Sequence, residues 1–119
     1  MNLHLTADPD AFLQRVSPTL LLDEARHSTA LGIALNCARG IRYGDEKPIF
    51  FWIENSNGLE GVGLWTPPFP LTLAFGSHEA LDRLAADLPA RAIAQLRLIN
   101  GPKAAVRHLA EALLRRLGT

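Results

Sequence analysis

Apolar positions follow a helical spacing near both ends of the chain and a strand-like spacing in its middle. A capping Asp8 predicts the start of a first short helix, and Ser17 repeats that signal before a second one. A third helix is expected over roughly residues 29–39, where Gly40 can supply a left-handed cap. Residues 2–5 are compatible with a short first strand. The pattern therefore predicts three short helices before any long strand.

The middle of the chain predicts a strand hairpin followed by a third strand. Residues 48–55, PIFFWIEN, are rich in aromatic and β-branched side chains. A tight turn at 56–58, SNG, leads into a return strand at 59–66, because asparagine and glycine tolerate positive φ. Prolines then end the pairing, and residues 71–75 form the next strand.

Side chains of the first long strand alternate between the two faces of the sheet. Phe50 and Trp52 share one face, and Phe51 points to the other. Both faces therefore need cover, which we expect from helices on one side and from a further domain or a second copy on the other. Gly61 and Gly63 in the return strand predict a bulge or a closely approaching backbone.

The C-terminal part predicts two helices around one weaker strand. Ser77 caps a helix over 78–88 that stops at Pro89, the strand covers 94–100, and the last helix covers 103–117. The apolar stripe of the last helix contains Val106, Leu109, Ala110, Leu113 and Leu117. The expected fold class is α+β, a mostly antiparallel sheet with N-terminal helices and two further helices.

Composition and charge narrow the class of protein. The chain has 119 residues, of which 48% are hydrophobic and 20% charged, as expected of one globular domain over residues 1–119. Lysine plus arginine and aspartate plus glutamate both total 12, so the net charge is zero. Without a basic excess we expect no nucleic-acid partner, whereas a net charge of zero favours self-association.

The sequence carries no signal for a metal, a disulfide or a membrane span. The single Cys37 allows no internal disulfide, and its apolar helical surroundings predict a buried small side chain rather than a nucleophile. His4, His27, His78 and His108 lack metal-ligand spacing, so we expect no metal site. The N-terminus has no signal-peptide pattern and no segment reaches about 18 apolar residues, so a cytoplasmic protein without a membrane partner is expected.

Three stretches carry a resemblance to a known superfamily. They are PIFFWIENSNGLEGVGLWTPPFPLTLA, EALDRLAADL and LINGPKAAVRHLAEAL. Together they resemble the N-terminal half of a bacterial group of two-part GNAT-like proteins, within the N-acetyltransferase superfamily. The turns at 65–68 and 100–102 are the most specific parts of the match. The resemblance implies a degenerate GNAT unit, with a second half that carries the acetyl-CoA site expected after Thr119.

The resemblance also implies where a pyrophosphate-binding loop would lie, at Gly76, Ser77 and His78 after the fourth strand. An active GNAT loop reads Gln/Arg-x-x-Gly-x-Gly/Ala, so that backbone N–H groups can approach the phosphates. Here Gly76 is the only glycine of the loop, and no Arg or Gln precedes it at the needed spacing. The side chains of Ser77 and His78 would crowd a diphosphate. Helix capping by Ser77 therefore explains the segment better, and acetyl-CoA is a cofactor by resemblance alone.

The expected function is that of a non-catalytic N-terminal domain of an N-acetyltransferase. It would support the catalytic half and help to form its acceptor groove at Trp65, Thr66 and Pro67, with a C-terminal GNAT domain or a second copy as its partner. Two alternatives stay open. A dimer could be an acetyl-CoA-dependent acetyltransferase itself, using residues 76–78. The chain could also be a stand-alone ligand-binding or interaction module, with a cleft near the Thr-Pro-Pro turn as its site.

No residue is assigned a catalytic role from the sequence. Tyr43, the only tyrosine, lies in a loop and is expected at the surface. Glu54 and Glu60 flank the hairpin turn and could face each other across the strands as solvated side chains. His27 is expected to join a surface ion pair with nearby acidic residues of its helix.

Overall fold

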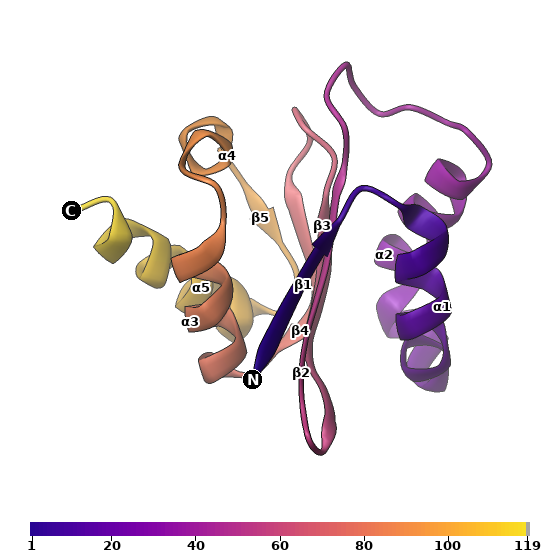
Figure 1. The fold of residues 1–119 in the computed structure, drawn as a ribbon, viewed down its shortest axis with the longest axis horizontal. Coiled ribbons are helices and arrows are strands. Elements are labelled where there is room, and N and C mark those ends of the chain that lie inside the picture. The colour runs from indigo at the N-terminus through magenta and orange to yellow at the C-terminus, as the bar shows by residue number, and fades with distance from the viewer. Residues whose placement is uncertain (119) are drawn as a thin grey trace.

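A five-stranded sheet stands between two layers of helices in the computed structural model, which describes residues 1–118 (Figure 1). The predicted α+β class is confirmed. In chain order the elements are β1 (Asn2–Thr6), α1 (Pro9–Leu20), a 3-10 turn (Leu21–Asp23), α2 (Glu24–Ala38), β2 (Ile49–Asn55), β3 (Gly58–Trp65), β4 (Leu71–Gly76), α3 (His78–Asp87), α4 (Ala90–Gln95), β5 (Ile99–Asn100) and α5 (Lys103–Arg116).

The strands follow one another in the sheet in the same order as in the chain, from β1 at one edge to β5 at the other. Each pairing is antiparallel except the last, in which β4 and β5 run parallel. That last pairing joins only Leu71 with Ile99 and Thr72 with Asn100. β4 therefore continues to Gly76 beyond its pairing with β5.

Helices α1 and α2 cover one face of the sheet (Figure 1). Phe12, Val16 and Leu20 lie one helical turn apart on α1 and are fully buried. They belong to one hydrophobic cluster with Phe50 and Val62 of the sheet. This stripe explains why α1 is a single helix.

The prediction of a helix break at Ser17 is wrong, because α1 runs through Pro18 to Leu20. Pro18 costs the helix one backbone hydrogen bond, but ending the helix there would take Leu20 off the buried stripe. The predicted third helix is the C-terminal part of α2, which begins at Glu24. The predicted left-handed cap residue after this helix is confirmed, since Gly40 has a φ of 91°.

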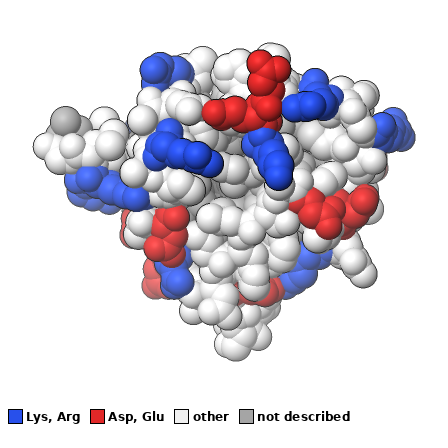
Figure 2. All heavy atoms as spheres, turned by 45° about the horizontal axis from the view of Figure 1, so that its top comes forward, with Lys and Arg blue, Asp and Glu red and all other residues white. Residues whose placement is uncertain are grey.

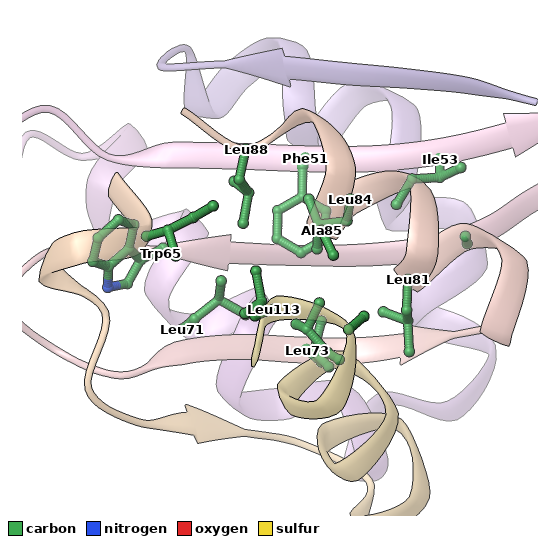
Figure 3. Packing of buried hydrophobic residues seen from close by; sticks show 14 of the residues in the cluster. Phe51, Ile53, Trp65, Leu71, Leu73, Leu81, Leu84, Ala85, Leu88 and Leu113 are labelled. Carbon is green, nitrogen blue, oxygen red and sulfur yellow. The ribbon is translucent and has the colours of Figure 1, made fainter. Parts of the chain in front are cut away.

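Helices α3 and α5 cover the opposite face (Figures 1 and 3). In Figure 3, Phe51 and Ile53 of β2 lie on the same side of the sheet as Leu81 and Leu84 of α3. The alternation predicted for Phe50 and Phe51 is therefore confirmed. The expectation that a further domain or second copy must cover one face is wrong, because helices of this chain cover both.

The two glycines of β3 mark irregular pairings, as predicted. The β2–β3 register shifts between Ile53 and Glu54, and the β3–β4 register shifts between Val62 and Gly63. A Cβ added at Gly63 would lie 2.6 Å from the carbonyl oxygen of Thr72. Only glycine lets the two strands approach this closely.

The region between α3 and α5 differs from the prediction. Residues 90–95 form α4, so Ala94 and Gln95, the first two residues of the predicted strand 94–100, belong to a helix, because Ala92 and Ile93 become buried by a helical turn after Pro89. The strand β5 is reduced to Ile99 and Asn100.

The apolar stripe of α5 is rotated from the predicted one. Its buried residues are Ala105, Leu109, Ala112 and Leu113. Leu117, a predicted stripe residue, is 57% exposed. The helix turns its small alanines inward because they allow α3 to pack closely against it.

Candidate functional site

The predicted groove residues lie where β3 ends and the chain turns toward β4. Trp65 is 3% exposed, and its indole Nε1 donates to the carbonyl oxygen of Phe69 at 2.8 Å. The backbone N–H of Phe69 in turn donates to the carbonyl oxygen of Thr66 at 2.9 Å. The peptide bond between Pro67 and Pro68 is cis. The turn is thus closed by its own backbone and anchored to the core through the indole.

A loop of residues 39–48, between α2 and β2, packs against this turn. The ring of Tyr43 meets the ring of Phe69 edge-on, with 5.9 Å between their centroids. Its hydroxyl oxygen accepts a hydrogen bond from the side-chain amide of Asn36 at 2.9 Å. Tyr43 is half-buried rather than free at the surface, so its role in the structure is to hold the loop against the turn.

Three hollows border the turn, and one of them, of about 440 Å³, is lined by Trp65, Pro67, Pro68 and Arg97 among others. Another, of about 340 Å³, lies beside the 39–48 loop and is lined by Thr66, Tyr43 and Cys37 among others. The third, of about 460 Å³, has an apolar lining from β1, β2, the turn and α4, and we call it the α4 groove. Its apolar lining includes Leu5, Ile49, Trp65, Pro67, Pro89 and Ala92. Each of the three predicted groove residues therefore lines a hollow: Thr66 lines the hollow of about 340 Å³, and Trp65 and Pro67 line the α4 groove.

Charged side chains that no sequence motif indicates surround these hollows. Lys47 and Arg91 line the α4 groove together with Glu46. They are 44 positions apart in the chain, and no local motif connects them. Only the helical turn of α4, which the sequence pattern did not predict, brings Arg91 to the same groove.

The predicted cofactor loop, residues 76–78, lies at the start of α3, and its groups already make contacts within the protein. The Ser77 Oγ accepts a hydrogen bond from the backbone N–H of Ala80 at 3.2 Å, which confirms the predicted cap. The backbone N–H of Ser77 donates to the carbonyl oxygen of Glu60 at 2.9 Å. A Cβ added at Gly76 would meet the Leu81 side chain at 2.7 Å, so this glycine faces packed side chains.

His78, the third residue of that loop, stacks on His108 of α5. The two rings are nearly parallel, with centroids 4.0 Å apart. The Nε2 of His108 lies 2.8 Å from a carboxylate oxygen of Asp82. The imidazole of His78 therefore joins a contact between α3 and α5 at the outer side of the helices. No group of His, Cys, Asp or Glu side chains within residues 1–118 has the arrangement of a metal site.

The two predicted sites lie at opposite ends of the sheet (Figure 1). Because β3 and β4 are antiparallel, the end of β3 at Trp65 and the end of β4 at Gly76 point in opposite directions. The six residues of β4 separate them by roughly 20 Å at the usual rise of a strand. The hollows around Trp65 contain no residue of the 76–78 loop.

The predicted contact between Glu54 and Glu60 across the hairpin is replaced by others. Glu54 is opposite Leu59, so it does not face Glu60. Instead its carboxylate forms an ion pair with Arg15 at 2.5 Å, and its other oxygen lies 2.9 Å from the Nε2 of His4. The hydrogen bond from Arg15 is the main cause that lowers the pKa of Glu54. A long-range ion pair of this kind depends on how α1 lies over the sheet, which no local pattern reveals.

Two further predictions about single side chains need correction. The Nδ1 of His27 lies 3.1 Å from the carbonyl oxygen of Leu20, and its ring is near Phe75, so the expected surface ion pair is not the contact observed. Cys37 is only partly buried, although burial still raises the pKa of its thiol. Both side chains lie on α2, which is longer and begins earlier than predicted.

Comparison with known protein families, with curated proteins and with solved structures found no significant match. In the part of the chain that the structure describes, no helix combines the length and the apolar character needed to cross a membrane.

Proposed function

We propose that this chain is a non-catalytic GNAT-like unit that supports the catalytic half of an N-acetyltransferase. Its Trp65–Pro67 end would contribute to the acceptor groove. Two helices, three strands, a helix, a strand and a final helix follow β1, and this order agrees with the resemblance apart from the short α4. The observation that carries the proposal is the closed start of α3.

A pyrophosphate would need backbone N–H groups that are open to it at the start of this helix. Two N–H groups near this helix start are already hydrogen-bonded. The N–H of Ser77 donates to the carbonyl oxygen of Glu60, and the N–H of Ala80 donates to the hydroxyl oxygen of Ser77. Glu79 places a negative charge in the first turn, where it disfavours a second anion. Acetyl-CoA is therefore expected to be held by another domain.

The first test is a calorimetric titration of acetyl-CoA into the purified chain, up to millimolar concentration. The expected result is no saturable heat, while an active GNAT enzyme titrated in parallel gives a normal binding curve. Saturable binding that is lost in Ser77→Asp, which keeps a capping oxygen but adds a charge, would show that the loop holds the cofactor after all. That outcome would favour the dimeric acetyltransferase alternative.

The second test addresses the supporting role. An antibody against the chain, applied to extracts of its own organism, is expected to detect a polypeptide well above 13.0 kDa. A band at 13.0 kDa would contradict a covalently attached catalytic half. Co-purification of acetyltransferase activity with the tagged natural protein distinguishes a separate catalytic partner from a chain that acts alone.

A second candidate function, a ligand-binding module that acts by itself, is favoured by the hollows at the Trp65–Pro67 end. Hollows of several hundred Å³ with apolar walls are the usual shape of small-molecule sites. This candidate requires a ligand for the α4 groove but no second domain.

A further inference from the structure

We infer that the α4 groove binds a small organic anion with an apolar body, of the class of medium-chain or aryl carboxylates, and that Lys47 and Arg91 hold its charged group. The inference rests on the groove having a binding role, which both candidate functions give it. It adds the chemical class of the ligand, which neither candidate function specifies.

The walls of the groove suit the apolar part of such a ligand. They include Leu5, Ile49, Pro67, Ala92 and the largely buried Trp65. Trp65 has its only polar atom engaged inside the protein, because Nε1 donates to Phe69. Leu5 is 41% exposed at the groove, a large apolar side chain that a ligand would shield from water.

Two cationic side chains at the groove have no partner among residues 1–118. The side chains of Lys47 and Arg91 form no ion pair and no hydrogen bond with any residue from 1 to 118. The neighbouring charges differ, since Arg97 donates to the backbone carbonyl of Ala94 and Glu46 accepts from the side chain of Gln95. Of the three charged side chains that line the α4 groove, Glu46, Lys47 and Arg91, only the two cations therefore lack a partner among residues 1–118.

The charge balance at this end is positive although the whole chain is neutral. The residues lining the α4 groove and the two hollows next to it include four cations and two anions, a local balance of +2. The cations are Arg42, Lys47, Arg91 and Arg97, and the anions are Asp45 and Glu46. Figure 2 shows basic side chains on both sides of an acidic group over this end of the molecule.

This combination selects among anions. Two unpaired cations can neutralise one carboxylate, whereas a polyanion such as a nucleic acid needs a broader basic surface than a neutral chain offers. The apolar walls gain nothing from a fully polar anion such as free phosphate. An anion with an apolar tail or ring satisfies both parts of the groove.

The test uses octanoate as the probe, with octanamide and octylamine as neutral and cationic probes of the same chain length. Titration by calorimetry, together with methyl NMR of Ile49 and Ala92, should show saturable octanoate binding at the groove. Octanamide is expected to bind at least about fivefold more weakly and octylamine not at all, because a charge contact is lost or reversed.

Charge variants assign the binding to the two cations. Lys47→Gln and Arg91→Gln are each expected to weaken octanoate binding about threefold to fivefold. The matched controls Lys103→Gln and Arg107→Gln remove exposed cations of α5, outside the groove, and should leave the affinity unchanged. Raising the salt concentration to about 0.5 M should weaken octanoate binding to the natural chain, and it should weaken octanoate binding to the groove variants by a smaller factor.

No octanoate binding, equal binding of octanoate and octanamide, or full affinity in both groove variants would each overturn the inference. These outcomes are separate from the acetyl-CoA titration, which tests the supporting-domain proposal at the other end of the sheet. If the chain binds neither octanoate nor acetyl-CoA, the inference about the anion groove is wrong, whereas the proposed non-catalytic role still stands.

Discussion

Gly44 lies directly against the carbonyl oxygen of Pro67. A Cβ added at Gly44 would come closer than 3.0 Å to that backbone atom, and it would also crowd the ring of Pro68 at 3.1 Å. The 39–48 loop can therefore rest on the Thr-Pro-Pro turn only because residue 44 has no side chain. This contact holds together the two segments that border the smallest of the three hollows and the α4 groove.

Gly44→Ala is expected to push the loop away from the turn and to destabilise the protein by about 1–3 kcal/mol, as overpacking usually does. Urea unfolding followed by tryptophan fluorescence gives the change in the free energy of unfolding. The matched control Asp45→Ala changes an exposed neighbour in the same loop and should cost less than about 0.5 kcal/mol. Equal stabilities of the two variants would mean that the loop does not rest on Pro67 in solution.

Gly63→Ala and Gly32→Ala should have effects of opposite sign. At Gly63 the new methyl group would lie 2.6 Å from the Thr72 carbonyl oxygen, within the β3–β4 pairing, so we expect a loss of at least about 2 kcal/mol. Gly32 lies inside α2 with nothing within 4 Å of an added Cβ, so alanine there should stabilise the helix by about 0.5–1 kcal/mol. Thermal and urea unfolding of the two variants measure both changes. A neutral Gly63→Ala would show that β3 and β4 can separate at little cost.

The parts of the fold that the sequence predicted are those set by local signals. Asp8, Ser77 and Gly40 act within one turn of their own helix, and each was found where its residue type placed it. The strand alternation of Phe50 and Phe51 is equally local, because successive side chains point to opposite faces.

The errors arose where tertiary packing outweighed a local preference. Pro18 is a helix-breaking signal, yet the burial of Leu20 continues α1 past it. The segment from Ala90 was too short for a clear periodicity, and packing of Ile93 against the α3–α5 layer made it a helix. At the candidate site, the turn at Trp65 was predicted from its motif, but the approach of Lys47 and Arg91 to one groove depends on the whole fold.

The ion pair of Glu54 with Arg15 should make stability depend on pH. Because the hydrogen bond from Arg15 lowers the pKa of Glu54 in the folded state, the contribution is present above the ordinary carboxyl value of 4.5 and is lost as pH falls through the lowered pKa. The pair is partly exposed, so we expect less than about 1 kcal/mol. Urea unfolding at several pH values between about 6 and 3 measures this loss.

Glu54→Gln should remove this part of the pH dependence, and Arg15→Gln should remove most of it. Glu60→Gln is the matched control, because Glu60 has no ion pair in the described part of the chain. If Glu54→Gln and Glu60→Gln gave the same pH profile as the natural chain, the contact between α1 and β2 would make no electrostatic contribution.

Cys37 reports on the same loop that Gly44 holds in place. Burial raises the pKa of its thiol, so the folded protein at pH 8 should contain less thiolate than the unfolded chain and react more slowly with iodoacetamide. The reaction is followed by mass spectrometry, with the urea-unfolded protein as the control. Cys37 lines the smallest of the three hollows together with Tyr43 and Gly44, so Gly44→Ala should expose the thiol and speed its alkylation, whereas Asp45→Ala should not. Alkylation of the natural chain at the unfolded rate would contradict the burial of Cys37, and an unchanged rate in Gly44→Ala would show that α2, rather than the loop, shields it.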